Sequence, residues 1–273
     1  GLTSITGGTV NVNAPVTMPN LTMTYGTLAG SGAVTVSGTF IWNGGAMGGT
    51  GVTNILAGGS LNLNATNYPT LDGRMLNSAG TATYSGATYW SLYNGAVFNN
   101  QAGGTFTVQN DQYIYSSGTV SFNNAGTFIK SAGTGTTTVT AAFNNTGTVN
   151  VQSGSLTLQD GGTSSGPFVI ASGTTLQFSG GIHNMTSTIS GAGAVDFSGG
   201  TVNISGTYNV TGLTSIRGGT VNFNTPVSVP NLLMTYGTLA GSGAVTVSGR
   251  LTWTGGTMSG TGATSVPSGG SLS

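Results

Sequence analysis

Short runs that alternate apolar and polar side chains fill most of this chain. TVNVQ at 148–152 is followed by SLTLQ at 155–159, PFVIA at 167–171 and TTLQF at 174–178. A period of two over so few residues, ended by Ser-Gly, Gly-Gly or Ala-Gly, predicts short β-strands joined by turns. The strand starts advance by 7, 12 and 7 residues, so two strands recur in a 19-residue cycle. Apolar residues at helical spacing and free of glycine do not occur, and no helix is predicted.

The same rhythm extends through the rest of the chain. AVDFS at 194–198 is paired with TVNIS at 201–205, and AVTVS at 33–37 with TFIW at 39–42. A unit this small cannot bury its own apolar face, but copies stacked on one another can. We therefore predict an all-β, single-stranded β-solenoid with coils of about 19–24 residues, continuous over 1–273. A β-sandwich array is the alternative, but its repeats of about 100 residues fit these evenly short strands poorly.

One motif shows how the coils stack. Phe-Asn-Asn followed by Gly-Thr starts at Phe98, Phe122 and Phe143, so the motif recurs once per coil. We expect the Phe to point into the interior and the Asn pair and Gly to form the turn, where left-handed backbone is accessible to these residues. On successive coils the Asn amides should then form a hydrogen-bonded ladder along the axis.

A much longer repeat contains these coils. Residues 2–51 recur as 213–262 without a gap, an offset of 211 residues with 38 identities in 50. We expect the two copies to share one local structure and to be related mainly by a translation of about 50 Å along the axis. The chain stops at a position that corresponds to Asn62, so we also expect the parent protein to continue with further repeats, on which open terminal coils would stack.

Differences between the copies predict which side chains face inward. Positions 40 and 42 stay apolar while Ile41 becomes Thr252, so Phe40, Trp42 and the matching Trp253 should face the interior. Thr6 becomes Arg217 and Thr39 becomes Arg250. Arginine without a nearby carboxylate requires water, and both positions should face outward.

Composition narrows the function. The chain has 50 glycines, no cysteine, 3% charged residues and a formal net charge of zero. It cannot neutralise a run of phosphates or an anionic membrane surface, which argues against nucleic-acid partners and membrane docking. No apolar stretch is long enough for a transmembrane helix, so no membrane insertion is expected.

Two segments of the sequence resemble a known family. GTVNVQSGSLTL at 147–158 and SGTTLQFSGG at 172–181 resemble the repeats of large secreted bacterial surface proteins, the filamentous haemagglutinin-like and autotransporter-passenger adhesins. The resemblance implies a right-handed parallel β-helix that acts as an extracellular or cell-surface stalk or adhesin without catalysis or cofactor. Its partners would be copies of itself end to end, further repeats of the parent chain, and surface glycans.

Aromatic residues form the best candidate for a ligand site. Their rings could stack on sugars, or they could fill the interior of one irregular coil. The candidates are Tyr84, Tyr89, Trp90, Tyr93, Tyr113 and Tyr115. A carbohydrate-binding or carbohydrate-cleaving β-helix centred on residues 84–115 is therefore the alternative to a structural or adhesive fibre.

Other chemistry has weaker support. His183 is the single histidine, so neither a His-based metal site nor a Ser-His-Asp triad can be assembled, and we expect a solvated turn histidine. Among the four aspartates, Asp72 and Arg74 should form a local ion pair, Asp160 should lie in a turn and Asp196 should face outward, while Asp111 has no assigned role. Ice binding through Thr-x-Thr pairs such as Thr22/Thr24 and Thr105/Thr107 would need that pair on every coil.

Overall fold

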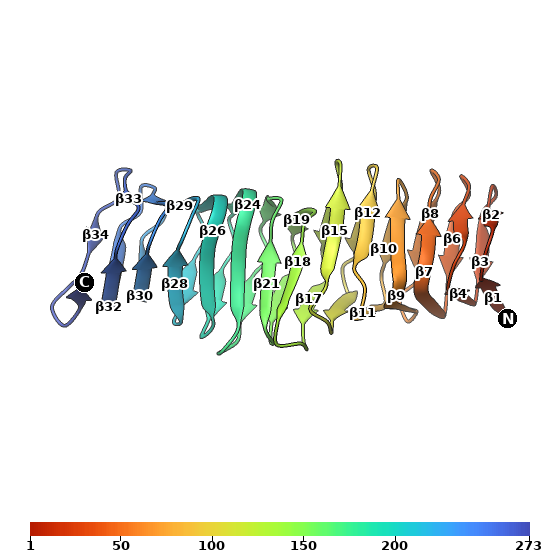
Figure 1. Ribbon diagram of the computed structural model, residues 1–273, viewed down its shortest axis with the longest axis horizontal. Helices are drawn as coiled ribbons and strands as arrows, with labels where there is room; N and C mark the ends of the chain where they lie inside the picture. The colour runs from red at the N-terminus through yellow and green to blue at the C-terminus, as the bar shows by residue number, and fades with distance from the viewer.

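The computed structural model describes residues 1–273 and is a parallel β-solenoid of about 14 turns without helices. Figure 1 shows an elongated rod with the N-terminus at one end and the C-terminus at the other. It contains no helix of the length and apolarity needed to span a bilayer. At about 4.8 Å per turn the axis is about 65 Å long.

Three strands make up each turn, and each strand pairs with its equivalents in the turns before and after. Several long strands bend around a corner and contribute to two faces. The first face contains β1 (Leu2–Ile5), β4 (Asn20–Met23), β7 (Thr39–Met47), β9 (Ser60–Asp72), β11 (Thr81–Gly86), β14 (Thr105–Val108), β17 (Thr127–Lys130), β20 (Thr148–Val151), β23 (Phe168–Ile170), β25 (Ile189–Gly191), β27 (Tyr208–Val210), β30 (Val227–Met234), β32 (Val245–Trp253) and β34 (Thr264–Ser265). The second face contains β2 (Thr9–Asn11), β5 (Thr27–Ala29), β12 (Trp90–Tyr93), β15 (Tyr113–Ser117), β18 (Thr136–Val139), β21 (Ser155–Leu158), β24 (Thr175–Met185), β26 (Ala194–Ile204), β28 (Leu213–Ile216), β35 (Ser271–Leu272) and the second halves of β7, β9, β30 and β32. The third face contains β3 (Val16–Met18), β6 (Val34–Val36), β8 (Val52–Ile55), β10 (Met75–Ser78), β13 (Val97–Asn100), β16 (Ser121–Asn124), β19 (Ala142–Asn145), β22 (Gly162–Ser164), β29 (Thr220–Phe223), β31 (Thr238–Ala240), β33 (Thr257–Met258) and the second halves of β24 and β26.

The predicted β-solenoid is confirmed. Leu2 pairs with Asn20 across one of the shortest coils, and Tyr113 pairs with Thr138 across the longest, so coil length varies slightly more widely than expected. The predicted strands AVDFS and TVNIS form one continuous strand, β26, which turns the corner between the second and third faces.

The interior is a single hydrophobic cluster of 58 buried residues. Phe40 and Trp42 have no exposed surface, whereas Ile41 between them is 36% exposed, which confirms the inward and outward positions predicted for this strand. Their rings stack with centroids 5.8 Å apart, and Trp42 meets Trp90 edge-on at 6.1 Å.

The Phe-Asn-Asn motif forms three stacks. Phe98, Phe122 and Phe143 are in register on the third face and fully or almost fully buried, with Phe98 and Phe122 ring centroids 4.8 Å apart. The second Asn of each motif also points inward: Asn100 donates to Asn124 at 2.6 Å, and Asn124 donates in turn to Asn145 at 2.7 Å. The predicted ladder is confirmed, but it lies within the strands and not in the turn.

The first Asn of the motif belongs to a second, outward ladder. Each amide donates to the one in the preceding turn, over 2.7–2.9 Å. The ladder runs through Asn54, Asn77, Asn99, Asn123 and Asn144, and continues after an interruption at Thr163 through Asn184, Asn203 and Asn222. Opposite orientation of the two Asn residues follows from the two-residue period of a strand.

The two copies of the sequence repeat form equivalent strands, but these strands lie on different faces of the rod. On the first face, β27 lies ten turns after β1. The sequence equivalent of β1 is however β28, one strand later, on the second face. Likewise β2 on the second face corresponds to β29 on the third. The expectation of a near-pure translation is therefore wrong: one sequence repeat advances the chain by ten turns plus one strand position, which adds a rotation of about a third of a turn.

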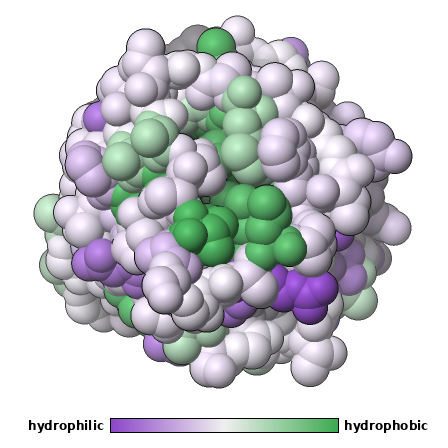
Figure 2. All heavy atoms as spheres, turned by 90° about the vertical axis from the view of Figure 1, so that its left-hand side faces the viewer, coloured by the Kyte–Doolittle hydropathy of each residue, from purple (hydrophilic) through white to green (hydrophobic).

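Two expectations about the second copy also need correction. Trp253 is 44% exposed, because it lies in the next-to-last turn and only Ser271–Leu272 of the last turn pairs near it. Figure 2 shows apolar residues gathered at the centre of this end of the rod. Arg217 does face outward, but it is paired with a carboxylate, that of Asp196.

Trp42 and Trp253 provide a matched test of interior packing, because they are equivalent in sequence and differ in burial. We expect Trp42→Ala to lower the free energy of unfolding by about 3–5 kcal/mol and Trp253→Ala by about 1 kcal/mol. Chemical denaturation of both variants measures the difference. Equal losses of unfolding free energy in the two variants would show that burial within the coil does not account for the contribution of this Trp to stability.

Candidate functional site

The most distinctive surface feature is a group of exposed tyrosines on the second face. Tyr89, Tyr93, Tyr113 and Tyr115 line a hollow of about 510 Å³ without any other residue. Tyr113 is 51% exposed and Tyr115 41%. The Tyr115 ring lies 6.0 Å from Tyr89 and 6.1 Å from Tyr93, tilted or edge-on in both cases. We call these four residues the tyrosine surface.

Strand register brings these residues together. β12 and β15 are adjacent, with Trp90 opposite Ile114 and Ser91 opposite Tyr115. Because Trp90 and Ile114 point inward, the residues on either side of each point outward, and tyrosines from two successive turns meet. The 211-residue repeat does not reproduce this surface within the chain, since residues 84–115 lie outside the duplicated segment.

Tyr68 extends the surface by one more turn and was missed from sequence. Its ring lies 4.8 Å from that of Tyr89, and it is 55% exposed with a left-handed backbone, φ 48°. The signal that could have identified it is its position one coil before Tyr89 in the sequence.

Two of the six predicted aromatic residues lie in the core. Tyr84 and Trp90 have no exposed surface. The Tyr84 hydroxyl donates to the Tyr113 carbonyl at 2.9 Å and accepts the backbone N–H of Trp90 at 3.1 Å, and burial raises its pKa. Neither side chain can contact a ligand. Tyr84 and Trp90 instead fill the interior of the coil, which was the alternative interpretation of the aromatic residues.

A polar hollow adjoins the tyrosine surface. It has a volume of about 420 Å³ and shares Tyr115 with its aromatic neighbour. The other lining residues are Ser116, Ser117, Gly118, Thr140, Gln159 and Asp160. Thr140 Oγ1 accepts the Ser116 backbone N–H at 2.6 Å, which fixes this hydroxyl in the wall of the polar hollow. Asp160 lies in a turn, as predicted.

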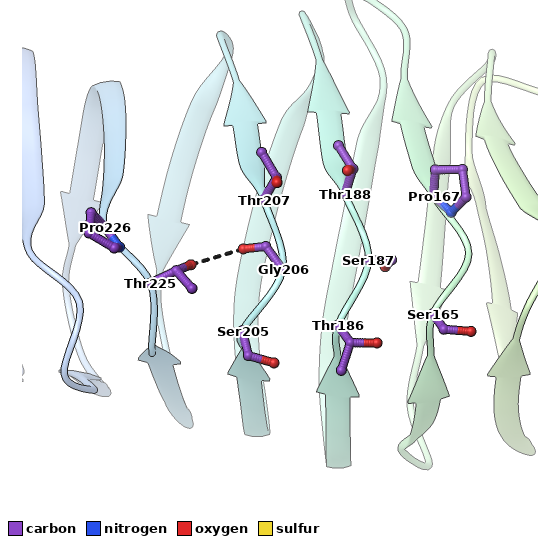
Figure 3. A pocket seen from close by; sticks show the side chains of 10 residues that line it. All are labelled: Ser165, Pro167, Thr186, Ser187, Thr188, Ser205, Gly206, Thr207, Thr225 and Pro226. Atoms are coloured by element: carbon purple, nitrogen blue, oxygen red, sulfur yellow. Dashed lines mark hydrogen bonds between the residues drawn. The ribbon is translucent and has the colours of Figure 1, made fainter.

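A separate groove at the corner between the third and first faces is lined by hydroxyl groups (Figure 3). It has a volume of about 480 Å³ and spans four successive turns. Its lining consists of Ser165, Pro167, Thr186, Ser187, Thr188, Ser205, Gly206, Thr207, Thr225 and Pro226. The Thr225 hydroxyl already donates to the Gly206 carbonyl at 2.9 Å, and the groove contains no aromatic ring or charged group on which a ligand could be anchored.

The expected Asp72–Arg74 ion pair is absent. Arg74 is fully buried at a corner and donates to the Thr53 hydroxyl at 2.9 Å and to the Gly48 carbonyl at 2.9 Å. Further carbonyls of the two preceding turns surround the rest of the guanidinium, and burial lowers its pKa. Asp72 instead accepts a hydrogen bond from Asn94 at 2.6 Å. The corner of stacked carbonyls thus replaces a carboxylate as the partner of the cation.

Two other charged pairs are structural. Lys130 occupies an inward position, is fully buried, and donates to Asp111 and the Asn110 carbonyl, each at 2.7 Å. This hydrogen bond lowers the pKa of Asp111. Asp196 faces outward but is covered by Arg217 and by Gln177, which donates to it at 2.9 Å. The hydrogen bond that Arg217 donates to Asp196 raises the pKa of Arg217.

The four aspartates do not form a catalytic pair. They lie on the fourth, sixth, eighth and tenth turns, in β9, before β15, after β21 and in β26. Successive carboxylates are two turns apart, about 9.6 Å along the axis, and they also lie at different corners or faces of the rod. Their separations therefore exceed the roughly 5–9.5 Å used by glycosidases. No group of three or more metal-ligating side chains occurs either.

The Thr-x-Thr pairs do not form two continuous rows of threonine along the rod. Thr105 is in register with Thr81 and Thr127, but the row of Thr107 passes from Thr83 to Ile129 and then Asn150. This geometry does not favour an ice-binding face.

His183 is buried, contrary to the expected solvated turn position. It is 2% exposed and lies in β24, where a change of register after Phe178 turns it inward. Its ring packs edge-on against Phe178 at 4.8 Å, and Nε2 is 3.1 Å from the Gly180 carbonyl. Burial lowers its pKa to about 4.

No protein-family model, curated protein or solved structure matches this chain. Its candidate sites therefore rest on geometry alone.

The buried His183 predicts a specific acid sensitivity. Its pKa is about 4 when folded and near 6.5 when unfolded, so the unfolded state takes up the proton first. The free energy of unfolding should be fully retained above pH 6.5 and should decrease by about 3 kcal/mol as the pH falls to 4. Urea titrations between these pH values measure the loss. His183→Phe, which keeps an aromatic ring against Phe178, should remove most of this pH dependence; an unchanged profile would contradict the assignment.

Proposed function

We propose that the chain is a rigid spacer segment of an adhesive fibre on a bacterial cell surface. The observation that carries this proposal is that the backbone ladders continue without interruption from β1 to β35, through the boundary where the 211-residue repeat begins again. Duplication therefore adds length to one rod and does not add a second globular body. A sequence that extends by such units is suited to holding a binding surface at a distance.

The surface chemistry supports an extracellular adhesive role. The exterior carries hydroxyl and amide groups in place of charges, and the two ordered Asn ladders stabilise the rod independently of salt. Every turn pairs with its neighbours through the same parallel ladder, and strands of this kind pair readily with further strands. Further repeats of the parent chain, or copies of the chain end to end, are therefore the proposed partners along the axis, and surface glycans are the proposed partners along the side.

A carbohydrate-cleaving β-helix is the weaker alternative. Its support is the tyrosine surface, which could hold a sugar chain. The carboxylates needed for hydrolysis are however two turns or more apart, and two of the four, Asp111 and Asp196, are engaged by cations. The geometry favours binding without cleavage.

The spacer proposal predicts a definite change in length. In a chain with residues 52–262 repeated once after residue 262, the join has the same sequence context as the native repeat boundary. We expect the maximum dimension to increase by about 50 Å, from about 65 to about 115 Å, with an unchanged cross-section. Small-angle scattering measures both quantities. A thicker particle of unchanged length would mean that repeats fold side by side, which contradicts the spacer proposal.

Absence of cleavage is a separate expectation. Neutral and acidic polysaccharides incubated with the protein, with and without calcium and from pH 4 to 9, should release no new reducing ends. A reducing-end assay with a known glycosidase as positive control measures this. Steady release that disappears in Asp160→Asn would establish the enzymatic alternative.

A further inference from the structure

We propose that the tyrosine surface and the adjoining polar hollow form one binding site for a neutral polysaccharide chain. The two hollows share Tyr115, so one ligand can contact both. This inference rests on the adhesive part of the proposed function and names its ligand class. The spacer part, tested by the length of the rod, is independent of it.

The aromatic half of the site offers ring faces to the solvent. Tyr89, Tyr113 and Tyr115 are each between 39% and 51% exposed, and the Tyr115 ring is tilted against that of Tyr89 and edge-on to that of Tyr93. The C–H faces of a pyranose ring pack against such aromatic faces, while its hydroxyls stay at the edge. A hollow lined by tyrosines alone therefore fits a ligand that is apolar on its faces and polar on its rim.

The polar half supplies partners for that rim. Gln159 provides an amide, Asp160 a carboxylate, and Thr140 a hydroxyl already held by the Ser116 backbone. Donors and acceptors placed beside an apolar surface fix the orientation of a ligand within a pocket. Sugar hydroxyls can both donate and accept, which matches this mixture of groups better than a purely apolar ligand does.

Charge selects a neutral glycan over an acidic one. The basic side chain nearest in sequence, Lys130, is fully buried against Asp111, and Arg74 is fully buried at its own corner. No cation lines either hollow, whereas Asp160 adds a negative charge. An acidic polysaccharide would meet a carboxylate without a compensating cation, which disfavours its binding.

The direction of the bound chain follows from the register. The tyrosines come from two successive turns, and Thr140 and Gln159 extend the site over the following two. Contact points therefore recur along the axis at about 4.8 Å, comparable to the advance of one hexose in an extended chain. A polysaccharide lying parallel to the rod can engage several turns at once.

The test uses the intact protein on an array of immobilised neutral glycans, with polygalacturonate and a proline-rich peptide as probes of the other ligand classes. We expect retention of at least one neutral glycan, and a Kd for its soluble oligomer that rises about fivefold or more in Tyr115→Ala. Tyr236→Ala is the matched control, because Tyr236 is 73% exposed and follows β30, four turns beyond the last turn of the site, and it should leave the Kd unchanged. Thermal melting checks that each variant is folded; should Tyr115→Ala unfold, Tyr113→Ala at the most exposed ring replaces it.

Several outcomes would overturn the proposal. One is that the protein retains no neutral glycan, and another is that it retains only polygalacturonate or only the peptide. A third is an affinity for the neutral glycan that neither Tyr115→Ala nor Tyr113→Ala changes. The lengthened chain with residues 52–262 repeated contains the whole site twice. It should bind two equivalents of oligosaccharide; a single equivalent would place the site outside residues 52–262. None of these failures would alter the expected length of that rod.

Discussion

The structure depends on the parallel hydrogen-bond ladder between successive turns. Because each turn must present its backbone to the turn before it at about 4.8 Å, residues at equivalent positions are forced to stack on one another. Phe98, Phe122 and Phe143 form one such stack and Asn100, Asn124 and Asn145 another. Identical residues in a stack provide one another with partners, since an amide can donate to the next amide and a ring can pack on the next ring. Repetition in the sequence is thus the means by which every turn finds a matching neighbour.

The same constraint explains the corners. An added Cβ at Gly147 would lie 1.9 Å from the Gly126 carbonyl oxygen, and one at Gly166 would lie 1.8 Å from that of Gly147. Side chains cannot be accommodated where turns approach so closely, so a column of glycines is required there. Columns of carbonyl oxygens at another corner create a site for a cation, which Arg74 fills without a carboxylate. A buried guanidinium is tolerated because nearly every donor has a partner.

Departures from regularity produce the candidate site. The longest coil, which runs from Tyr113 to its partner Thr138, occurs beside the tyrosine surface. Lys130 lies within this coil and is buried against Asp111, which lies just before the coil in the sequence, while the rings of Tyr113 and Tyr115 at its start are exposed. Most of the rod is regular, and one irregular region on its side has a surface with different chemistry.

Alternation along the chain was enough to predict the solenoid, its coil length, the inward positions of Phe40 and Trp42 and the existence of an Asn ladder, because each follows from a two-residue period repeated once per turn. It could not predict which side chains of TYWSLY at 88–93 face inward, because apolar and aromatic residues occupy both alternating sets of positions in this segment. The pairing of Trp90 with Ile114 in the folded rod places both side chains in the interior and leaves Tyr89, Tyr113 and Tyr115 exposed. The partners of Arg74 and Asp72 and the burial of His183 after a change of register likewise arise only in three dimensions. So does the rotation between the two sequence copies, because the face on which a strand lies depends on the summed lengths of all preceding turns, and those lengths vary from coil to coil.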